Sequence, residues 1–190
     1  MDARRWDEMY RSRDQVFSGD PNPVLVAETA GLVPGRALDV GCGEGADAIW
    51  LARKGWRVTA VDVSEVALGR AAAASDGDWV EWVRADVADV APRLGAFDLV
   101  SVQYFPLRRR HVSLRGLLDA VAPGGTLLFA THALADLDDP GDYSQPDDIV
   151  RLLEPLSWRV QVNETRRRAG PAPVGTRHSH DAVLRALRLT

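Results

Sequence analysis

The stretch "LDVGCGEGADAIWLARKG", from Leu38 to Gly55, places three glycines between an apolar run and a helix-forming run. These glycines are Gly41, Gly43 and Gly45. A glycine-rich turn from a strand into a helix brings the backbone close to a ligand and directs the unpaired N–H groups of the helix toward it. The stretch therefore predicts a strand, a ligand-binding turn and a helix, in that order.

Outward from this stretch, apolar runs alternate with helix-forming runs between residues 36 and 131. Examples are "WRVTAVDV" and "FDLVSVQYF" for strands, and "SEVALGRAAAAS" and "LRGLLDAVAPGG" for helices. Strand and helix in repetition predict a parallel sheet, and continuously apolar strands are typical of a sheet with helices on both faces. Ser64 is predicted to cap a helix, Gly55 to follow one, and "APGGT", residues 122–126, to turn tightly from a helix into a strand.

Residues 1–30 do not follow the alternation of strand and helix patterns found in this core. The spacing of four side chains predicts a helix with an aromatic face: Trp6, Met9, Tyr10 and Phe17. The run "SGDPNP" then separates this helix from a second one over residues 24–30. We expect the segment to be a helical lid or flank.

The C-terminal part, residues 132–190, begins with an acidic, loop-like segment that leads to a predicted helix over 147–153. Two strands, near 158–164 and 180–187, flank "RRRAGPAPVGT" and are expected to form an antiparallel hairpin that closes one sheet edge. Together with the core over 36–131, the pattern predicts a single domain over residues 1–190. Its fold class is α/β: a Rossmann-like, doubly wound sheet of about seven strands, mostly parallel, with helices on both faces.

The overall composition limits the partners of the chain. Its 190 residues, 46% hydrophobic and 26% charged, are typical of one ordinary globular domain without a membrane span. The net charge of -4 argues against a nucleic-acid partner, and a single cysteine excludes an intrachain disulfide and a cysteine-based metal cluster. The charged N-terminus lacks the layout of a secretory signal. We therefore expect a cytoplasmic monomer or homodimer that binds no membrane, nucleic acid or metal.

Several conspicuous residues are expected to have structural roles. The arginine runs 108–110 and 166–168 are interpreted as solvated faces or loops. Cys42 is interpreted as a small filler whose backbone matters, and Asp98 as a residue that orders the entry to a strand.

Two ligand classes use a glycine turn of this kind. Gly41, Gly43 and Ala46 satisfy the degenerate dinucleotide pattern GxGxx(G/A), and Asp62, 21 residues after Gly41, suits the ribose hydroxyls of NAD. Asp39 favours S-adenosylmethionine instead. An acid two residues before Gly41 is costly to bury unless it has a partner, and the methionine amine is a suitable cation.

Longer motifs carry a family resemblance. The run "LDVGCGEGADAIWLARKGWRVTAVDVS", followed in order by "FDLV" and "APGGTLLF", resembles the class I S-adenosylmethionine-dependent methyltransferases over residues 36–131. The N-terminal "WDEMYRS" and "SGDPNPVL" are similar to the tellurite-resistance and thiopurine methyltransferase-like branch of that class. The resemblance implies S-adenosylmethionine as the methyl donor and S-adenosylhomocysteine as the product.

The resemblance also implies cofactor contacts position by position. The glycine turn would surround the methionine part, Asp62 would accept from both ribose hydroxyls, and Asp86 and Val87 would hold the adenine edge. The full set is Asp39, Gly41, Cys42, Gly43, Asp62, Val63, Asp86, Val87 and Gln103. Taken singly, Asp62 also suits a helix cap and Asp86 a turn, so these alternatives stay open.

The acceptor is expected at the carboxyl ends of the strands, where open α/β sheets bind ligands. The predicted walls of its pocket are Trp6, Tyr10, Phe17, Tyr104, Phe105 and His132. Transfer by in-line displacement from an activated methyl donor depends mainly on positioning, so a base is needed only for an acceptor that keeps its proton near neutral pH. His132 is the predicted base and His111 the second choice, and each also suits a structural role.

We therefore expect a methyltransferase that acts on S, Se, Te, O or N of a small molecule. The related branch commonly has a histidine where this chain has Phe105 and Pro106, which leaves the acceptor open. Two alternatives also remain: an NAD-dependent oxidoreductase with the same glycine turn, and a non-catalytic module that binds S-adenosylmethionine. The latter stays open because catalysis by positioning requires no nucleophile that a sequence would reveal.

Overall fold

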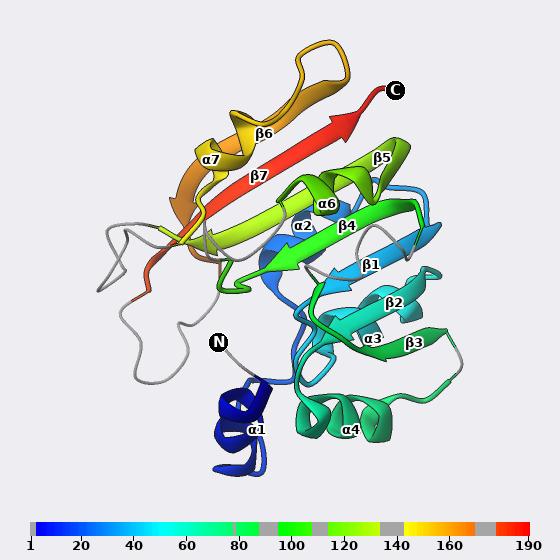
Figure 1. Cartoon of the computed structure of the whole chain (residues 1–190), viewed down its shortest axis with the longest axis vertical. Coiled ribbons are helices and arrows are strands. Elements are labelled where there is room, and N and C mark those ends of the chain that lie inside the picture. Colours follow the sequence, from blue (N-terminus) through cyan, green and yellow to red (C-terminus); the bar gives the residue numbers. More distant parts are fainter. Residues whose placement is uncertain (1–2, 78, 88–94, 108–113, 134–142, 170–177) are drawn as a thin grey trace.

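The computed structural model describes residues 3–77, 79–87, 95–107, 114–133, 143–169 and 178–190 (Figure 1). The helices are α1 (Ala3–Arg11), α2 (Pro23–Thr29), α3 (Ala46–Arg53), α4 (Glu65–Ala74), α6 (Leu114–Asp119) and α7 (Pro146–Val150). The strands are β1 (Arg36–Val40), β2 (Arg57–Asp62), β3 (Val80–Arg84), β4 (Phe97–Gln103), β5 (Val121–His132), β6 (Trp158–Arg167) and β7 (His180–Arg188). None of the helices in these ranges has the length and apolar character needed to cross a membrane.

The seven described strands form one sheet in the order β3-β2-β1-β4-β5-β7-β6. Strands β1 to β5 pair in parallel, whereas β7 pairs antiparallel with both β5 and β6. The predicted α/β fold, with a mostly parallel sheet and an antiparallel C-terminal hairpin, is confirmed. The strand order reverses between β1 and β4, so their carboxyl ends flank the switch point at which open α/β sheets bind ligands.

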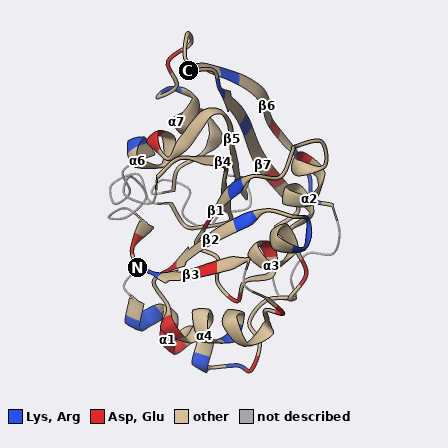
Figure 2. Ribbon diagram, turned by 90° about the vertical axis from the view of Figure 1, so that its right-hand side faces the viewer, with Lys and Arg blue, Asp and Glu red and all other residues tan. Residues whose placement is uncertain are grey.

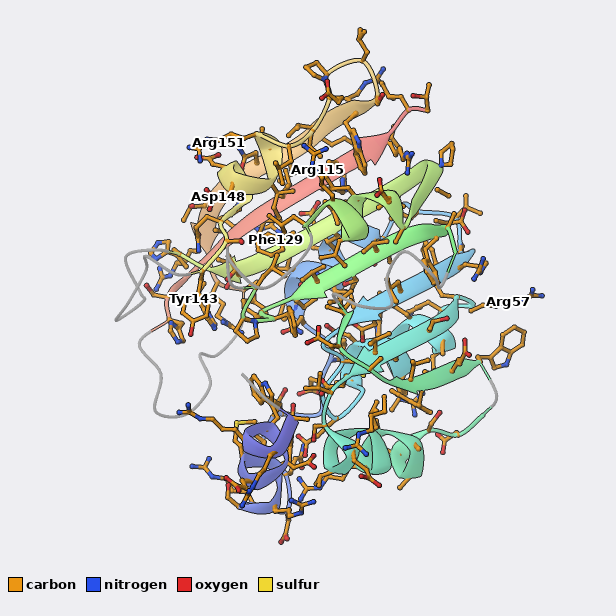
Figure 3. The ribbon with its side chains drawn as sticks, in the orientation of Figure 1. Arg57, Arg115, Phe129, Tyr143, Asp148 and Arg151 are labelled. Atoms are coloured by element: carbon orange, nitrogen blue, oxygen red, sulfur yellow. The ribbon has the colours of Figure 1, made fainter. Side chains whose placement is uncertain are left out.

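Helices cover both faces of the sheet, with α2 and α3 on one side and α6 and α7 on the other (Figure 2). Successive residues of a strand point to opposite faces, so β1 directs Leu38 and Val40 into the apolar cluster under α6 and α7. Phe129 of β5 belongs to the same cluster (Figure 3). Ala37 joins the cluster under α2 and α3. By the same alternation, Asp39 points to the side of α3.

Local signals set several boundaries as predicted. The Ser64 hydroxyl caps α4 by accepting from the Ala67 N–H at 3.1 Å. Gly55 follows α3 with a φ of 92°, which suits a glycine just beyond a helix. Asp98 orders the start of β4, because its Oδ2 accepts from the Arg36 N–H of β1 at 2.7 Å.

Two predicted helix lengths were wrong. Helix α1 ends at Arg11, where the Ser12 hydroxyl donates to the Met9 carbonyl at 2.6 Å, so Phe17 lies outside the predicted aromatic helix. Helix α7 ends at Val150 rather than at residue 153, because the backbone bonds from Leu152 and Leu153 join residues three apart.

The predicted tight turn at residues 122–126 was also wrong. Strand β5 already begins at Val121, which pairs with Phe97, and the register then shifts to a pair between Leu99 and Thr126. The intervening residues bulge out of the strand, and Gly124 has a φ of 79° there. The burial of Phe97 and Val121, each 0% exposed, explains why pairing starts before the bulge.

The interpretation of the arginine run 166–168 as a solvated face was wrong for Arg166 and Arg168, whereas Arg167 is exposed. Glu28 of α2 is 7% exposed and pairs with Arg166 of β6 at 2.8 Å and with Arg185 of β7 at 3.1 Å. Arg168 pairs with Asp181 at 3.5 Å. Buried carboxylates require such partners. The two Glu28 pairs fasten the C-terminal hairpin to α2, and the Arg168–Asp181 pair joins β7 to the residue that follows β6. The other arginine run, 108–110, lies outside the described residues.

Candidate active site

The glycine turn joins β1 to α3 at the carboxyl edge of the sheet. Gly41, Gly43 and Gly45 have φ values of 68°, 53° and 86°, a region that L side chains rarely adopt. Space is also short. A Cβ on Gly43 would lie 2.8 Å from the Tyr10 hydroxyl oxygen, and a Cβ on Gly41 would overlap the Phe105 ring. Backbone conformation and packing both require glycine at these two positions.

Hydrogen bonds hold the glycine turn against the end of β2. The Gly41 N–H donates to the Val61 carbonyl at 2.8 Å. The Gly43 N–H donates to Asp62 Oδ2 at 2.9 Å, and the Ser64 N–H donates to Asp62 Oδ1 at 2.8 Å. Asp62 thus joins the glycine turn to the start of α4. Asp62 does not itself cap α4: Ser64 does, and Asp62 holds the N–H of this capping residue.

Three carboxylates lie beside the glycine turn: Asp39, Asp47 and Asp62. Asp39 is 2% exposed, and its Oδ2 has no hydrogen-bond partner within the described ranges. Burial, and then the charges of Asp47 and Asp62, raise the pKa of Asp39 well above its usual value. Burial also raises the pKa of Asp47, although Asn22 donates to it from its backbone and its side chain, at 2.7 and 2.8 Å. A buried carboxylate that has a raised pKa and an oxygen without a partner favours a cationic ligand.

Residues 3–22, which we call the N-terminal strap, are fastened to the glycine turn by Glu44. Its Oε2 accepts from the N–H groups of Val16 and Phe17, both at 3.1 Å. Its Oε1 pairs with Arg70 of α4 at 2.8 Å, and Arg70 also donates to the Tyr10 carbonyl at 2.9 Å. Helix α1 lies beside α4 as a result (Figure 1).

The predicted aromatic wall forms in part. Tyr10 is 3% exposed, and its ring centroid lies 6.3 Å from that of Trp6 and 6.2 Å from that of Phe17. Burial, and then the charges of Asp62 and Glu44, raise the pKa of Tyr10, so its phenol stays neutral. Phe17 is 53% exposed, so it covers Tyr10 from the outside instead of walling a pocket.

Backbone strain marks the end of β4. Tyr104 has a φ of 52°, an uncommon value for a residue other than glycine, and its N–H donates to the Ala130 carbonyl at 2.8 Å. Gln103, just before it, is buried and its Oε1 has no hydrogen-bond partner in the described part of the chain. After this turn, Phe105 packs on Gly41. Two successive residues at the end of β4 therefore belong to different regions: Phe105 packs on the glycine turn, and Tyr104 lies in the cluster described next.

The second region is a cluster that we call the histidine stack, formed by Tyr104, His132, Arg168, His178 and Asp181. The His132 ring lies 4.9 Å from the Tyr104 ring and 3.7 Å from the His178 ring, centroid to centroid. The Arg168 guanidinium lies 4.8 Å over the Tyr104 ring and pairs with Asp181 at 3.5 Å. Burial, and then the charge of Asp181, raise the pKa of Tyr104.

The predicted adenine contacts lie past the ends of β2 and β3. Val63 is half-buried, and Asp86 is exposed just after β3. Val87 is 3% exposed and belongs to the same core cluster as Val61. Burial, and then the charge of Asp39, raise the pKa of the Cys42 thiol, in keeping with the interpretation of this residue as a filler.

The structure brings most predicted residues to the carboxyl edge of β1, β2 and β4, while His111 lies outside the described residues. Sequence reasoning missed six residues: Glu44, Asp47, Arg70, Arg168, His178 and Asp181. Two acids inside the glycine turn were a usable signal for Glu44 and Asp47. The other four meet their partners only through the tertiary fold, so no local pattern indicated them.

Residues 37–125 match a family model described as a methyltransferase domain. A 2-heptyl-1-hydroxyquinolin-4(1H)-one methyltransferase from Mycobacteroides abscessus is 30% identical over 165 residues, which cover 80% of this chain and 72% of that protein. The chain spans about half the length of several other curated methyltransferases that it matches.

Two solved structures with the same fold illustrate the likeness. The N-methyltransferase NodS from Bradyrhizobium japonicum WM9, in complex with S-adenosyl-L-homocysteine, gives a TM-score of 0.77 at 20% identity and covers 99% of this chain and 98% of its own. TehB from Haemophilus influenzae gives a TM-score of 0.68 at 15% identity, over 97% of this chain and 67% of its own. At these identities the likeness concerns the fold alone.

Proposed function

The chain belongs to the class I S-adenosylmethionine-dependent methyltransferases, and we propose that it transfers a methyl group to a heteroatom of a small molecule. One observation carries this proposal: a buried carboxylate oxygen without a hydrogen-bond partner, Asp39 Oδ2, at the carboxyl end of β1 beside the glycine turn. The ammonium group of a methionine moiety supplies the cation that this carboxylate requires.

The residues around Asp39 fit the rest of the methionine moiety. Gly41 and Gly43 let the backbone approach a ligand closely, and Gln103 offers a buried side-chain oxygen that also has no partner in the described ranges. Cys42 contributes its backbone. When bound, S-adenosylmethionine supplies a methyl group that is already activated on a sulfonium.

The remaining cofactor contacts follow from positions at the ends of β2 and β3. Each oxygen of Asp62 already accepts one backbone N–H, and each keeps a further lone pair for a ribose hydroxyl. We place the adenine ring against Val63, with Asp86 and the backbone of Val87 at its edge. Asp86 is exposed at this edge of the sheet.

The protein itself has to hold the acceptor in line and exclude water. Tyr10 of the N-terminal strap lies above Gly43, and Phe105, which follows β4, lies above Gly41. Together they cover the glycine turn and supply apolar walls. His132, at the end of β5, is the proposed base for acceptors that carry a proton.

We propose the class of methyl acceptor from the name of one relative and from the sequence motifs of the N-terminal strap. The Mycobacteroides abscessus relative is named for a hydroxyquinolone, which supports a small aromatic acceptor. The N-terminal motifs of the tellurite-resistance and thiopurine branch keep selenium, tellurium and sulfur acceptors in the set, although the likeness to TehB concerns the fold alone. An acceptor panel therefore has to include thiols, selenite, tellurite, phenols and hydroxyheteroaromatic compounds.

Calorimetric titration of the purified chain with S-adenosylmethionine, S-adenosylhomocysteine and NAD tests the proposal. We expect micromolar binding of both adenosyl ligands, loss of that binding in Asp62→Ala, and no binding of NAD. Asp76→Ala is the control, because Asp76 pairs with Arg53 on the surface, where its side chain is 86% exposed. Binding of NAD alone would overturn the proposal.

A further inference from the structure

Two histidines stack at the carboxyl edge of the sheet. His132 ends β5, and His178 precedes β7, the strand that pairs with β5. Their ring centroids are 3.7 Å apart and the ring planes differ by 13°. Both side chains are half-buried, and Nδ1 of His178 is a buried atom without a hydrogen-bond partner among the described residues. A buried, unpartnered imidazole nitrogen is suited to receive a proton or a ligand.

The side chains that surround this histidine pair are either neutral or already joined in an ion pair. Tyr104 from β4 packs on His132, and its phenol stays neutral. Arg168, beyond the end of β6, lies over the Tyr104 ring and pairs with Asp181 of β7 at 3.5 Å. Because this guanidinium is neutralised by a buried carboxylate, it provides little attraction for an anionic acceptor. The neighbouring His180 is exposed and contacts the Ser179 hydroxyl at 2.8 Å.

The stacking distance limits the charge of the pair. Two imidazolium ions with ring centroids 3.7 Å apart repel strongly, so the binding of a proton by one ring opposes the binding of a second by the other. The His132 ring already contacts the Tyr104 and His178 rings, and Arg168 lies over Tyr104, so His178 is the member of the stack best suited to packing against another flat ring. The site therefore combines a single proton acceptor with a planar wall.

We propose that His132 and His178 act as one base, a stacked pair that takes up one added proton near neutral pH and receives it from a flat aromatic acceptor. The nucleophilic oxygen or nitrogen of that acceptor is neutral and protonated before reaction. This inference rests on the proposed methyl transfer and adds to it a second histidine and an acceptor class. Oxyanions such as selenite and tellurite fall outside that class.

The step balances in atoms and charge. The acceptor loses its O–H or N–H proton to an imidazole nitrogen and gains the methyl group on the same heteroatom. The electron pair of the broken carbon–sulfur bond stays on sulfur, so the positive charge of the sulfonium leaves with the proton on the histidine pair. The proton then passes to solvent, which restores the neutral pair.

Histidine titration by NMR tests the shared proton without any turnover. In the full chain with isotope-labelled histidine, we expect the ring signals of His132 and His178 to change together with pH, because the two rings share the added proton. In His178→Phe, which keeps a flat ring but removes the nitrogens, His132 is expected to titrate in one step. Independent single steps for His132 and His178, unchanged in the variant, would overturn the shared proton.

Phenol and thiophenol, two acceptors with the same ring, test the base. Phenol keeps its proton near neutral pH, whereas thiophenol is largely ionised. We expect His132→Gln and His178→Phe to lower kcat for phenol by about 100-fold or more and kcat for thiophenol by less than about 3-fold. His180→Gln is the matched control and is expected to change neither rate. Equal losses for the two acceptors, or no loss with phenol, would refute the base.

Calorimetry with S-adenosylhomocysteine separates the two proposals. If the parent chain does not bind it, the proposed methyl transfer fails. If the parent binds it and methylates selenite or tellurite but neither phenol nor thiophenol, the acceptor class proposed here fails while methyl transfer stands. Unchanged affinity in His178→Phe shows that this variant keeps the cofactor end intact, so a selective loss with phenol then supports the histidine pair.

Discussion

The glycine turn and the histidine stack lie at the same edge of the sheet but are assembled in different ways. The glycine turn is contiguous, from Asp39 to Asp47, and its shape follows from three left-handed glycines and hydrogen bonds to the adjacent strand. The histidine stack draws one residue each from the ends of β4, β5 and β6, and two from the start of β7. Only sheet register, such as the pairing of His132 with Asp181, brings these residues together.

The difference predicts that the two regions can be damaged separately. Changes in the glycine turn should weaken cofactor binding through backbone conformation and buried charge. Changes in the histidine stack should alter stability and acceptor chemistry while the folded protein keeps its cofactor affinity. The strained Tyr104, which precedes Phe105 at the end of β4, is where the two regions meet.

The largest effect on stability is expected in the histidine stack. The side chains of Arg168 and Asp181 are 11% and 2% exposed, so Arg168→Leu leaves a buried carboxylate without its partner. We expect the free energy of unfolding to fall by about 3–5 kcal/mol, measured by urea denaturation. S-adenosylhomocysteine affinity of the folded fraction should stay within about 2-fold, because the glycine turn is untouched.

The double variant Arg168→Leu with Asp181→Leu is the matched control. It removes both charges and should recover most of the lost stability, since apolar pairs often replace buried ion pairs without net cost. If the double variant is as unstable as the sum of the single variants, packing rather than charge explains the loss. A large loss of cofactor affinity in Arg168→Leu would show that the two regions are not separate.

Gly43→Ala is expected to give the next largest effect, now at the cofactor end. A left-handed backbone costs alanine about 1–2 kcal/mol, and its Cβ would lie 2.8 Å from the Tyr10 hydroxyl oxygen. The turn has to shift, so S-adenosylhomocysteine affinity should fall by about 10-fold or more in calorimetry. Gly69→Ala, within α4 and with no atom near its added Cβ, should instead stabilise by about 0.5–1 kcal/mol. Equal affinities in the two variants would contradict the role of the turn.

The contrast between these two regions also explains which parts of the fold and of the site could be predicted from the sequence. The strand, glycine turn and helix around Gly41, and the order of strands up to β5, leave local patterns because each element is contiguous. Asp62 was predictable because its distance from Gly41 along the chain is fixed by one helix and one strand. His178 and Asp181 carried no such pattern, since their partners are set by the pairing of β5, β6 and β7. The arginine run was misinterpreted for the same reason: Glu28, its partner, is far away in sequence.

Asp39→Asn should separate stability from binding within the glycine turn. Burial raises the pKa of Asp39 in the folded state above an unfolded value of about 4, so the folded protein holds this proton more tightly. Stability therefore falls as pH rises from about 4 through the folded pKa, and the destabilisation is complete above it. At neutral pH the variant is expected to be about 1 kcal/mol more stable, yet to bind S-adenosylmethionine more weakly.

Urea denaturation between about pH 4 and pH 8 measures this difference. The advantage of Asp39→Asn should grow with pH, although the curve of the variant still falls, because burial also raises the pKa of Asp47 and of Asp62. Parallel curves for parent and variant would mean that Asp39 finds a partner in solution. The proposal that Asp39 binds the ammonium group of the methyl donor would then lose its main support.

The smallest effect is expected where the strap meets the glycine turn. Glu44→Gln keeps an acceptor for the Val16 N–H but loses the charge that pairs with Arg70, so the strap should loosen by about 1 kcal/mol. Hydrogen exchange at Val16 and Phe17 should then speed up severalfold, by mass spectrometry of the intact chain. Arg53→Gln breaks a pair whose side chains are 64% and 86% exposed, and should change stability by less than about 0.5 kcal/mol. If exchange is unchanged in Glu44→Gln, the strap is held at its ends, by Asn22 on Asp47 and Asp7 on Ser64, and the glycine turn serves the cofactor alone.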